Sequence, residues 1–97
     1  MRMNGAFFSL SAALLPRGTS PKASCVVSKK VSVRAVDRNR IKRQCRHAVA
    51  PILKTIKKPI VFAFFARREA LGAEYADLER DVQKLVERAL SRYNPAT

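Results

Sequence analysis

The sequence predicts a single α+β domain in which helices pack on an antiparallel-rich sheet. Short apolar segments of strand-like composition and two longer segments of helical periodicity follow one another in the order β-β-α-β-α. A chain of 97 residues has the length of one domain, and its 47% of hydrophobic residues is typical of a folded protein. We therefore interpret residues 1–97 as one domain, with the terminal segments 1–6 and 94–97 expected to be loose.

The first two elements are predicted to be strands. Residues Phe7 to Leu14 suit a strand, and the segment 15–21, which contains Pro, Gly, Thr and Ser, has the composition of a turn. A second strand, Ala23 to Ser28, would place Cys25 and Val27 on one face. Because a turn separates these two strands, we expect them to form an antiparallel hairpin.

The third element is predicted to be a helix, because apolar residues between 41 and 56 recur at helical spacing. Val33 and Val36 fall outside this stripe, so the helix should begin near Asp37, whose carboxylate suits an N-cap. The stripe consists of Ile41, Cys45, Ala48, Val49, Ile52 and Ile56.

The end of this helix is expected at Pro59, and three lysines between residues 54 and 58 suit the negative end of the helix dipole. Pro51 interrupts the pattern. It predicts a kink, or an earlier end of the helix near Ala50.

The last two elements are a strand and a helix. Residues 60–66 are continuously apolar, which predicts a central strand covered on both faces. Apolar residues then recur at helical spacing from Tyr75 to Tyr93, with mixed charge on the other faces, and predict a second helix.

Charge is distributed very unevenly along the chain. Residues 1–68 hold sixteen Lys and Arg and one acid, Asp37, whereas residues 69–97 hold four Lys and Arg and six acids. The predicted basic helix presents Arg38, Lys42 and Arg46 in one row at i, i+4, i+8, with Asn39, Arg43 and His47 in a second row and Arg40 beside it. Such a surface predicts a polyanionic partner, with nucleic acid as the first candidate and an anionic membrane as the second.

Several kinds of chemistry are disfavoured. Metal-assisted cleavage needs clustered carboxylates, and the basic part of the chain offers only Asp37, so we expect no catalytic residue and no metal site. Cys45 and His47, two residues apart on a helix, diverge and do not form a catalytic pair. Two cysteines do not make a disulfide framework, so Cys25 and Cys45 are expected to be reduced thiols of a cytoplasmic protein.

Aromatic residues near the amino terminus could contact unpaired bases. Phe7 and Phe8 are candidates for stacking on such bases, although adjacent strand residues face opposite ways and one of the two is expected in the core. The three phenylalanines of residues 60–66 are expected in the core. The apolar stretch after Arg2 also resembles a secretory signal, but two serines interrupt it and no clear cleavage site follows, so we disfavour that interpretation.

The segment from Val26 to Arg46, VVSKKVSVRAVDRNRIKRQCR, resembles the signature of the bacterial ribonuclease P protein subunit. That family's pattern is a strand ending in V-S-K-K-V, a short loop, and then A-V-x-R-N-R-x-K-R-x-x-R. The resemblance extends over roughly residues 7–93. It implies a sheet with the basic helix in a left-handed β-α-β crossover. It also implies binding of a catalytic RNA and of the 5′ leader of precursor tRNA.

In such a complex the RNA performs the Mg²⁺-dependent cleavage, so the resemblance implies no cofactor on the protein, no membrane and no small-molecule substrate. The leader would lie in a cleft between the basic helix and the sheet. Carried over by position, the RNA-binding set is Lys29, Lys30, Arg34, Arg38, Asn39, Arg40, Lys42, Arg43 and Arg46.

The sequence departs from the family pattern in three places. The family usually begins with a basic, aromatic-bearing helix that nothing before Phe7 supplies, so we expect either a naturally short form or a gene start placed too late. A glycine common after the two lysines is Ser32 here, and the acid that often follows the last arginine is His47.

Two other interpretations remain open. The first is a structural RNA-binding protein of the ribosomal type without a role in processing. The second is a membrane-active cationic protein, although the apolar face of the basic helix lacks the bulky aromatic residues usual at a membrane surface.

Overall fold

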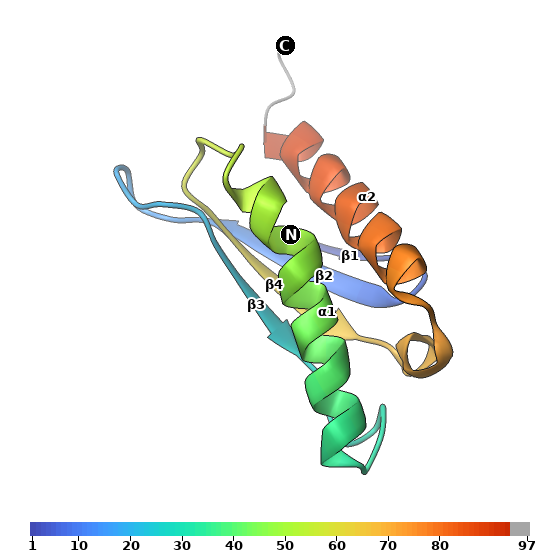
Figure 1. Cartoon of the computed structure of the whole chain (residues 1–97). Coiled ribbons are helices and arrows are strands. Elements are labelled where there is room, and N and C mark those ends of the chain that lie inside the picture. The colour runs from blue at the N-terminus through green and yellow to red at the C-terminus, as the bar shows by residue number, and fades with distance from the viewer. Residues whose placement is uncertain (94–97) are drawn as a thin grey trace.

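The computed structural model describes residues 1–93 and shows a four-stranded sheet with both helices on one of its faces (Figure 1). This architecture confirms the predicted α+β class, and it contains the predicted order β-β-α-β-α after one additional strand. The expectation for residues 94–97 lies outside the described part of the chain. The elements are β1 (Arg2–Asn4), β2 (Phe8–Leu14), β3 (Lys22–Val26), α1 (Ala35–Leu53), β4 (Ile60–Ala66), the short 3-10 helix η1 (Arg68–Gly72) and α2 (Tyr75–Tyr93).

The strand order is β1-β2-β4-β3, so the predicted hairpin of β2 with β3 is wrong. β4 lies between them, antiparallel to β2 and parallel to β3. Neighbouring strands are about 4.8 Å apart, so the segment 15–21 crosses roughly 10 Å to pass over the position of β4. Turn composition predicted the reversal of the chain correctly, but it carried no information about a strand inserted from farther along the sequence.

α1 connects the parallel strands β3 and β4 across the face of the sheet that carries both helices (Figure 1). Viewed from the helix side with both strands pointing upward, the chain moves from β3 through α1 to β4 on the left. This is the left-handed crossover that the family resemblance implied, a hand that is rare among β-α-β units.

β4 is central, as predicted, but it is covered on one face only. Ile60, Phe62 and Phe64 are fully buried and point toward the helices, whereas Val61 and Phe65 on the opposite face are half-buried. The prediction of cover on both faces is therefore wrong. A continuous apolar run indicates a strand in the interior of a sheet, but it does not show whether helices cover one face of that sheet or both.

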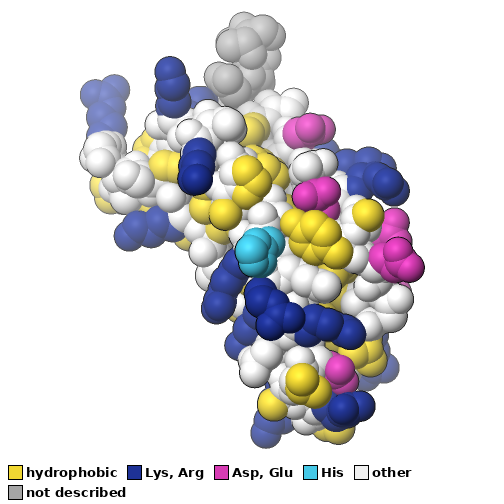
Figure 2. All heavy atoms as spheres, viewed as in Figure 1, with side chains coloured by type: hydrophobic (Ala, Val, Ile, Leu, Met, Phe, Trp, Pro, Cys, Tyr) yellow, Lys and Arg dark blue, Asp and Glu magenta, His cyan; other side chains and the backbone are white. Residues whose placement is uncertain are grey.

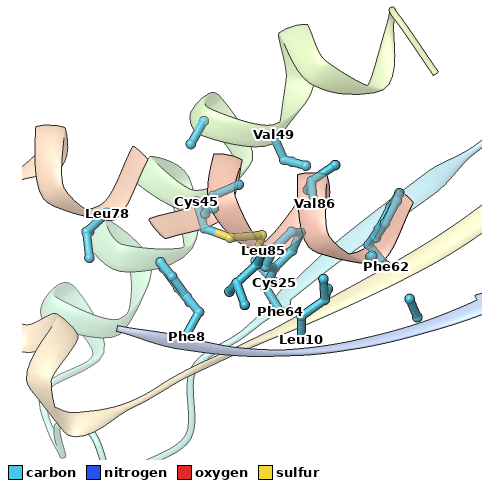
Figure 3. Packing of buried hydrophobic residues seen from close by; sticks show 14 of the residues in the cluster. Phe8, Leu10, Cys25, Cys45, Val49, Phe62, Phe64, Leu78, Leu85 and Val86 are labelled. Atoms are coloured by element: carbon cyan, nitrogen blue, oxygen red, sulfur yellow. A yellow bond between two sulfur atoms is a disulfide. The ribbon is translucent and has the colours of Figure 1, made fainter. Parts of the chain in front are cut away.

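The core fills the space between the helices and this one face of the sheet (Figure 3). Phe8 and Phe64 meet edge to face with ring centroids 6.2 Å apart. Both predicted helical stripes supply most of the opposing side chains: Ile41, Cys45, Ala48 and Val49 come from α1, and Leu78, Val82, Leu85, Val86 and Ala89 come from α2. Ile56 of the first stripe is buried but lies beyond the helix, and Tyr75 of the second is exposed.

The boundaries of α1 differ slightly from the prediction. The helix begins at Ala35, so Asp37 lies in its first turn and is not the N-cap. Ser32 explains the shift, because its hydroxyl donates to Asp37 Oδ2 at 3.0 Å and accepts from the Arg34 amide at 3.2 Å, which turns the chain earlier. Pro51 lies inside the helix, which continues past Ala50 but ends at Leu53, so the predicted end at Pro59 and the alternative end near Ala50 are both wrong. Turn hydrogen bonds from the amides of Thr55 and Ile56 to the carbonyls of Ile52 and Leu53 follow the last helical residue.

Cys25 and Cys45 form a disulfide, contrary to the expectation of reduced thiols (Figure 3). Their Cα atoms are 6.4 Å apart, and both residues are buried where β3 meets α1. The sequence shows only a separation of 20 residues. The pairing follows from packing α1 directly on β3, which brings their apolar faces together.

The amino-terminal residues are ordered, so the expectation of a loose segment 1–6 is wrong. β1 pairs with β2, and the buried carboxylate of Asp81 on α2 fixes the turn between them. It accepts hydrogen bonds from the amides of Ala6, Phe7 and Phe8 at 3.0, 2.9 and 2.9 Å. Gly5 is required beside it, because a Cβ at that position would lie 2.5 Å from Asp81 Oδ1.

Candidate nucleic-acid interface

The outer surface of α1 carries the predicted basic side chains. The apolar stripe turns toward the sheet, so the remaining positions of the helix face outward (Figure 2). Asn39, Arg43 and Arg46 are exposed, whereas Arg38, Arg40 and Lys42 are half-buried. We call these six residues the basic helix surface. The structure therefore brings together on one helix six of the nine side chains that the sequence assigned to RNA.

Two arginines of this surface are held by backbone carbonyls. Arg38 Nη1 donates to the carbonyl of Ser32 at 2.9 Å, and Arg40 Nη2 donates to the carbonyl of Leu71 in η1 at 2.9 Å. A guanidinium has five N–H donors, so each arginine keeps donors for an external ligand while one bond fixes its position. The basic helix surface is thus partly preorganised.

The loop before α1 adds the remaining three predicted cations. Lys29 and Lys30 are exposed in a turn that the Val31 amide closes onto the Ser28 carbonyl at 3.1 Å. Arg34, also exposed, lies 3.9 Å from Asp37 Oδ2. An exposed pair at that distance adds little to stability, so Arg34 remains available to a stronger anionic ligand.

The position of these cations along the helix opposes the helix dipole. The amino-terminal end of a helix carries partial positive charge, and a cation there costs about 0.3–1 kcal/mol. Arg34 and Arg38 lie at the start and in the first turn of α1, where Asp37 is the one acid. The hydrogen bond from Arg38 to the Ser32 carbonyl and the proximity of Arg34 to Asp37 offset this cost in the free protein, and a bound phosphate would complement both the side-chain charges and the dipole.

Of the two candidates for base stacking, one lies in the core, as predicted. Phe8 is 1% exposed in the core and is unable to stack on a base, whereas Phe7 is half-buried and remains a candidate. The prediction that Phe65 lies in the core is wrong, because this residue lies on the face of the sheet opposite the helices. The centroid of its ring is 5.5 Å from the guanidinium carbon of Arg2. Sequence reasoning missed Phe65 because strand alternation alone does not show which face lacks a covering layer.

We call that face of the sheet the uncovered face. Strand register places Phe65 of β4 between Ser9 of β2 and Val26 of β3, and Ala63 between two serines in the next row. Its residues are half-buried or exposed. They are Ser9, Ser11, Ser24, Val26, Val61, Ala63 and Phe65, with Arg2 and Lys22 at the margins.

The cleft expected between the basic helix and the sheet is not present where the two meet. Ile41 and Cys45 are 0% exposed against the sheet, and the disulfide joins α1 to β3 directly. Well-packed side chains fill this contact, so a nucleic-acid strand would have to follow another surface.

Neither a metal cluster nor a membrane span is found in the described residues. Residues 1–93 contain no group of three or more His, Cys, Asp or Glu side chains placed to hold a metal ion. Asp37, the one acid of the basic region, accepts a hydrogen bond from the Ser32 hydroxyl, and its Oδ2 lies 3.9 Å from Arg34 Nε. No helix within residues 1–93 has the length and apolar character needed to cross a bilayer.

Comparisons with known proteins agree with one another. The family model described as Ribonuclease P matches residues 2–90. The ribonuclease P protein component of Pseudanabaena sp. strain PCC 6903 is 32% identical over 88 residues, which cover 91% of this chain and 76% of the relative. That of Synechococcus sp. strain JA-2-3B'a(2-13) is 29% identical over 91 residues, 91% of this chain and 68% of the relative.

Solved structures show the same fold. The RNase P protein of Staphylococcus aureus superposes with a TM-score of 0.80 at 20% identity, over 92% of this chain and 80% of that chain. The RNase P protein of Thermotoga maritima gives a TM-score of 0.78 at 16% identity, over 91% of this chain and 82% of that chain.

Proposed function

Because the chain belongs to the ribonuclease P protein family, we propose that it binds the catalytic RNA of ribonuclease P and the 5′ leader of precursor tRNA. In this proposal the RNA performs the Mg²⁺-dependent cleavage and the protein supplies no catalytic group. The observation that carries the proposal is the basic helix surface, which presents five Lys and Arg side chains on the outward side of α1, a helix whose one acid is Asp37.

The physical role of the basic helix surface is to lower electrostatic repulsion between two RNAs. Each contact between a Lys or Arg and a phosphate releases counterions, so affinity should fall with salt at a log–log slope of about −0.7 to −0.9 per contact. Arginine can also bind two phosphate oxygens at once through its planar fork. A lower local negative potential would let Mg²⁺ occupy sites in the RNA at a lower bulk concentration.

We place the leader on the uncovered face rather than between α1 and the sheet. Phe65 offers an aromatic surface on which an unpaired base can stack, a contact worth about 1–3 kcal/mol per base. The serines on either side of β4 offer hydroxyl groups, and Arg2 supplies a cation at the margin for the backbone. This arrangement suits a single strand read without strong sequence preference.

The proposal is tested by removing charge from the basic helix surface. The variant Arg43→Gln with Arg46→Gln changes two exposed side chains, and neither makes a hydrogen bond or ion pair among those found within residues 1–93. Lys84→Gln with Arg92→Gln is the matched control, since it removes two exposed cations from α2 and leaves the same net charge.

Cleavage of a leader-bearing precursor tRNA by the cognate catalytic RNA is measured against Mg²⁺ concentration. We expect the Arg43/Arg46 variant to need several-fold more Mg²⁺ for half-maximal cleavage, and its salt slope to fall by about 1.4–1.8. The control should resemble the unaltered protein. Equal Mg²⁺ requirements in both variants would contradict the proposal, as would an unaltered chain that leaves cleavage unchanged.

A further inference from the structure

A second group of exposed cations lies at the opposite end of α1 from the first turns of the basic helix surface. We propose that Arg17, Lys22, Lys54 and Lys57, here called the distal cations, form a second contact surface for the ribose-phosphate backbone of the same catalytic RNA. The inference rests on the proposed function, because it assigns an additional surface to the same partner.

The fold brings the distal cations to one end of the sheet from two separate segments. Leu14 pairs with Ile60, and the Leu15 amide donates to the Pro59 carbonyl at 2.6 Å. Lys22 at the start of β3 pairs with Val61. The connection 15–21 and the segment 54–59 therefore leave and enter the sheet side by side (Figure 1).

The distal cations are free to meet a ligand. All four are exposed, and the three ion pairs found within residues 1–93 involve other residues. Lys58 differs from them, because it is half-buried and its ammonium donates to the Tyr93 carbonyl, which is a structural role. In Figure 2 the dark blue side chains at the upper left end stand apart, without acidic side chains among them.

Helix stability explains only part of this cluster. Lys54 caps the carboxyl end of α1 and Lys57 follows three residues later, where the helix dipole favours a cation. Arg17 and Lys22 lie on the connection between β2 and β3 and at the start of β3, where no helix end attracts them. Four like charges from two segments repel one another unless an external anion balances them.

The two basic surfaces are far enough apart to act independently. The nearest members of the two surfaces are Arg46 and Lys54, eight residues apart along α1, which at 1.5 Å per helical residue is about 12 Å. This exceeds the screening length of about 8 Å at physiological ionic strength, so phosphate contacts at the two surfaces should add in the salt dependence. The molecule is elongated, 42 Å in its longest dimension, and a large folded RNA can reach both ends of it.

A lipid surface fits the distal cations less well. Leu14, 59% exposed, lies at this end of the sheet. Tyr75, the one exposed aromatic residue within residues 1–93, lies at the start of α2 instead. Binding to a membrane surface normally combines cations with a bulky apolar or aromatic face. Cations on strand and loop segments without such a face are better suited to phosphates of RNA.

Two variants test the inference, one on each segment. They are Lys54→Gln with Lys57→Gln, and Arg17→Gln with Lys22→Gln; Lys84→Gln with Arg92→Gln on α2 serves again as the charge-matched control. The dissociation constant for the cognate catalytic RNA is measured over a series of salt concentrations. We expect each distal variant to reduce the magnitude of the log–log slope by about 1.4–1.8, and the control by less than about 0.5.

The outcome separates this inference from the proposed function. If Arg43→Gln with Arg46→Gln lowers the slope while both distal variants match the control, the distal surface is refuted and the proposed function stands. If none of the variants differs from the control, both fail. The same proteins are tested for sedimentation with vesicles of phosphatidylcholine and phosphatidylserine. Loss of vesicle binding by the distal variants with an unchanged RNA slope would also overturn the inference.

Discussion

Asp81 should be the most sensitive polar position in the fold. Its carboxylate is buried, and it accepts the amides of three consecutive residues, Ala6, Phe7 and Phe8. It thereby ties the turn between β1 and β2 to α2, across more than 70 residues of sequence. The informative change is Asp81→Asn, because it preserves the shape of the side chain and removes the charge and one acceptor oxygen.

The cost follows from the geometry. Oδ2 serves Phe7 and Phe8, and Oδ1 serves Ala6. An asparagine oxygen at the Oδ2 position keeps two weaker bonds, while its NH₂ group faces the Ala6 amide, so two donors meet. Losing one hydrogen bond to a charged acceptor costs about 1.5–3 kcal/mol, so we expect a loss of about 2–3 kcal/mol in the free energy of unfolding. In a domain of this size that lowers the melting temperature by roughly 10–20 °C.

Thermal and urea unfolding followed by circular dichroism provide the assay. Asp77→Asn is the matched control on the same helix, because Asp77 makes an exposed ion pair with Arg80 at 3.6 Å and its loss should cost less than about 1 kcal/mol. Equal destabilisation by the two substitutions would refute the assigned role of Asp81.

Gly5 gives an independent check. Gly5→Ala would place a Cβ 2.5 Å from Asp81 Oδ1 and should destabilise the protein, whereas the added methyl has more room once Asp81→Ala has removed the carboxylate. The double variant should therefore lose less free energy of unfolding than the sum of the losses in the two single variants. Simple additivity would show that the two positions are not in contact.

Three further predictions concern other parts of the molecule. Reducing the disulfide, which spans 20 residues, should lower the free energy of unfolding by about 3 kcal/mol, and identical urea midpoints with and without reductant would contradict this. Phe64→Ala in the core should cost about 3–5 kcal/mol, whereas Phe65→Ala on the uncovered face should cost clearly less and weaken leader binding instead; the reverse order would be inconsistent with one-sided cover. Desolvation, aided by Glu79, raises the pKa of Tyr75 above its ordinary value of 10.0, so its small stabilising contribution is complete below pH 10 and is lost as pH rises through the raised value. Glu79→Gln should move that pKa back down in an absorbance titration, and an unmoved pKa would exclude Glu79 as a cause.

The helices and the position of the basic side chains could be predicted because both depend on local periodicity. A stripe at about 100° per residue fixes which side of a helix is buried, and the charged residues must then face outward. The sequence between 41 and 56 was therefore sufficient to place Arg43 and Arg46 on the surface. The resemblance over residues 26–46 added the family and the handedness of the crossover, which periodicity does not contain.

The pairing of strands and the cover of the sheet could not be predicted in the same way. Residues 60–66 were recognised as a central strand, but their neighbours depend on contacts with segments far away in the sequence. The same limit applied to the disulfide, whose cysteines meet only after α1 packs on β3.

The burial of Asp81 is a different case, because its position in the sequence relative to the apolar stripe of α2 could have predicted it. Asp81 stands three residues after Leu78 and four before Leu85, at the edge of the buried stripe of α2. An acid at such a position indicates a buried acceptor for amides from elsewhere in the chain. The mixed charge of the neighbouring positions suggested a solvated helix face instead.

The insertion of β4 between β2 and β3 has a consequence for biosynthesis. While the ribosome is still adding the first 59 residues, β3 has no partner strand, and β2 can pair only with the three residues of β1. Most of the positive charge has been translated by then, before the acid-rich α2. Compaction must wait for these distant contacts, which is typical of slow folding topologies. Until residues 60–66 are available to pair with β2 and β3, the basic part of the nascent polypeptide therefore lacks the central strand of its sheet.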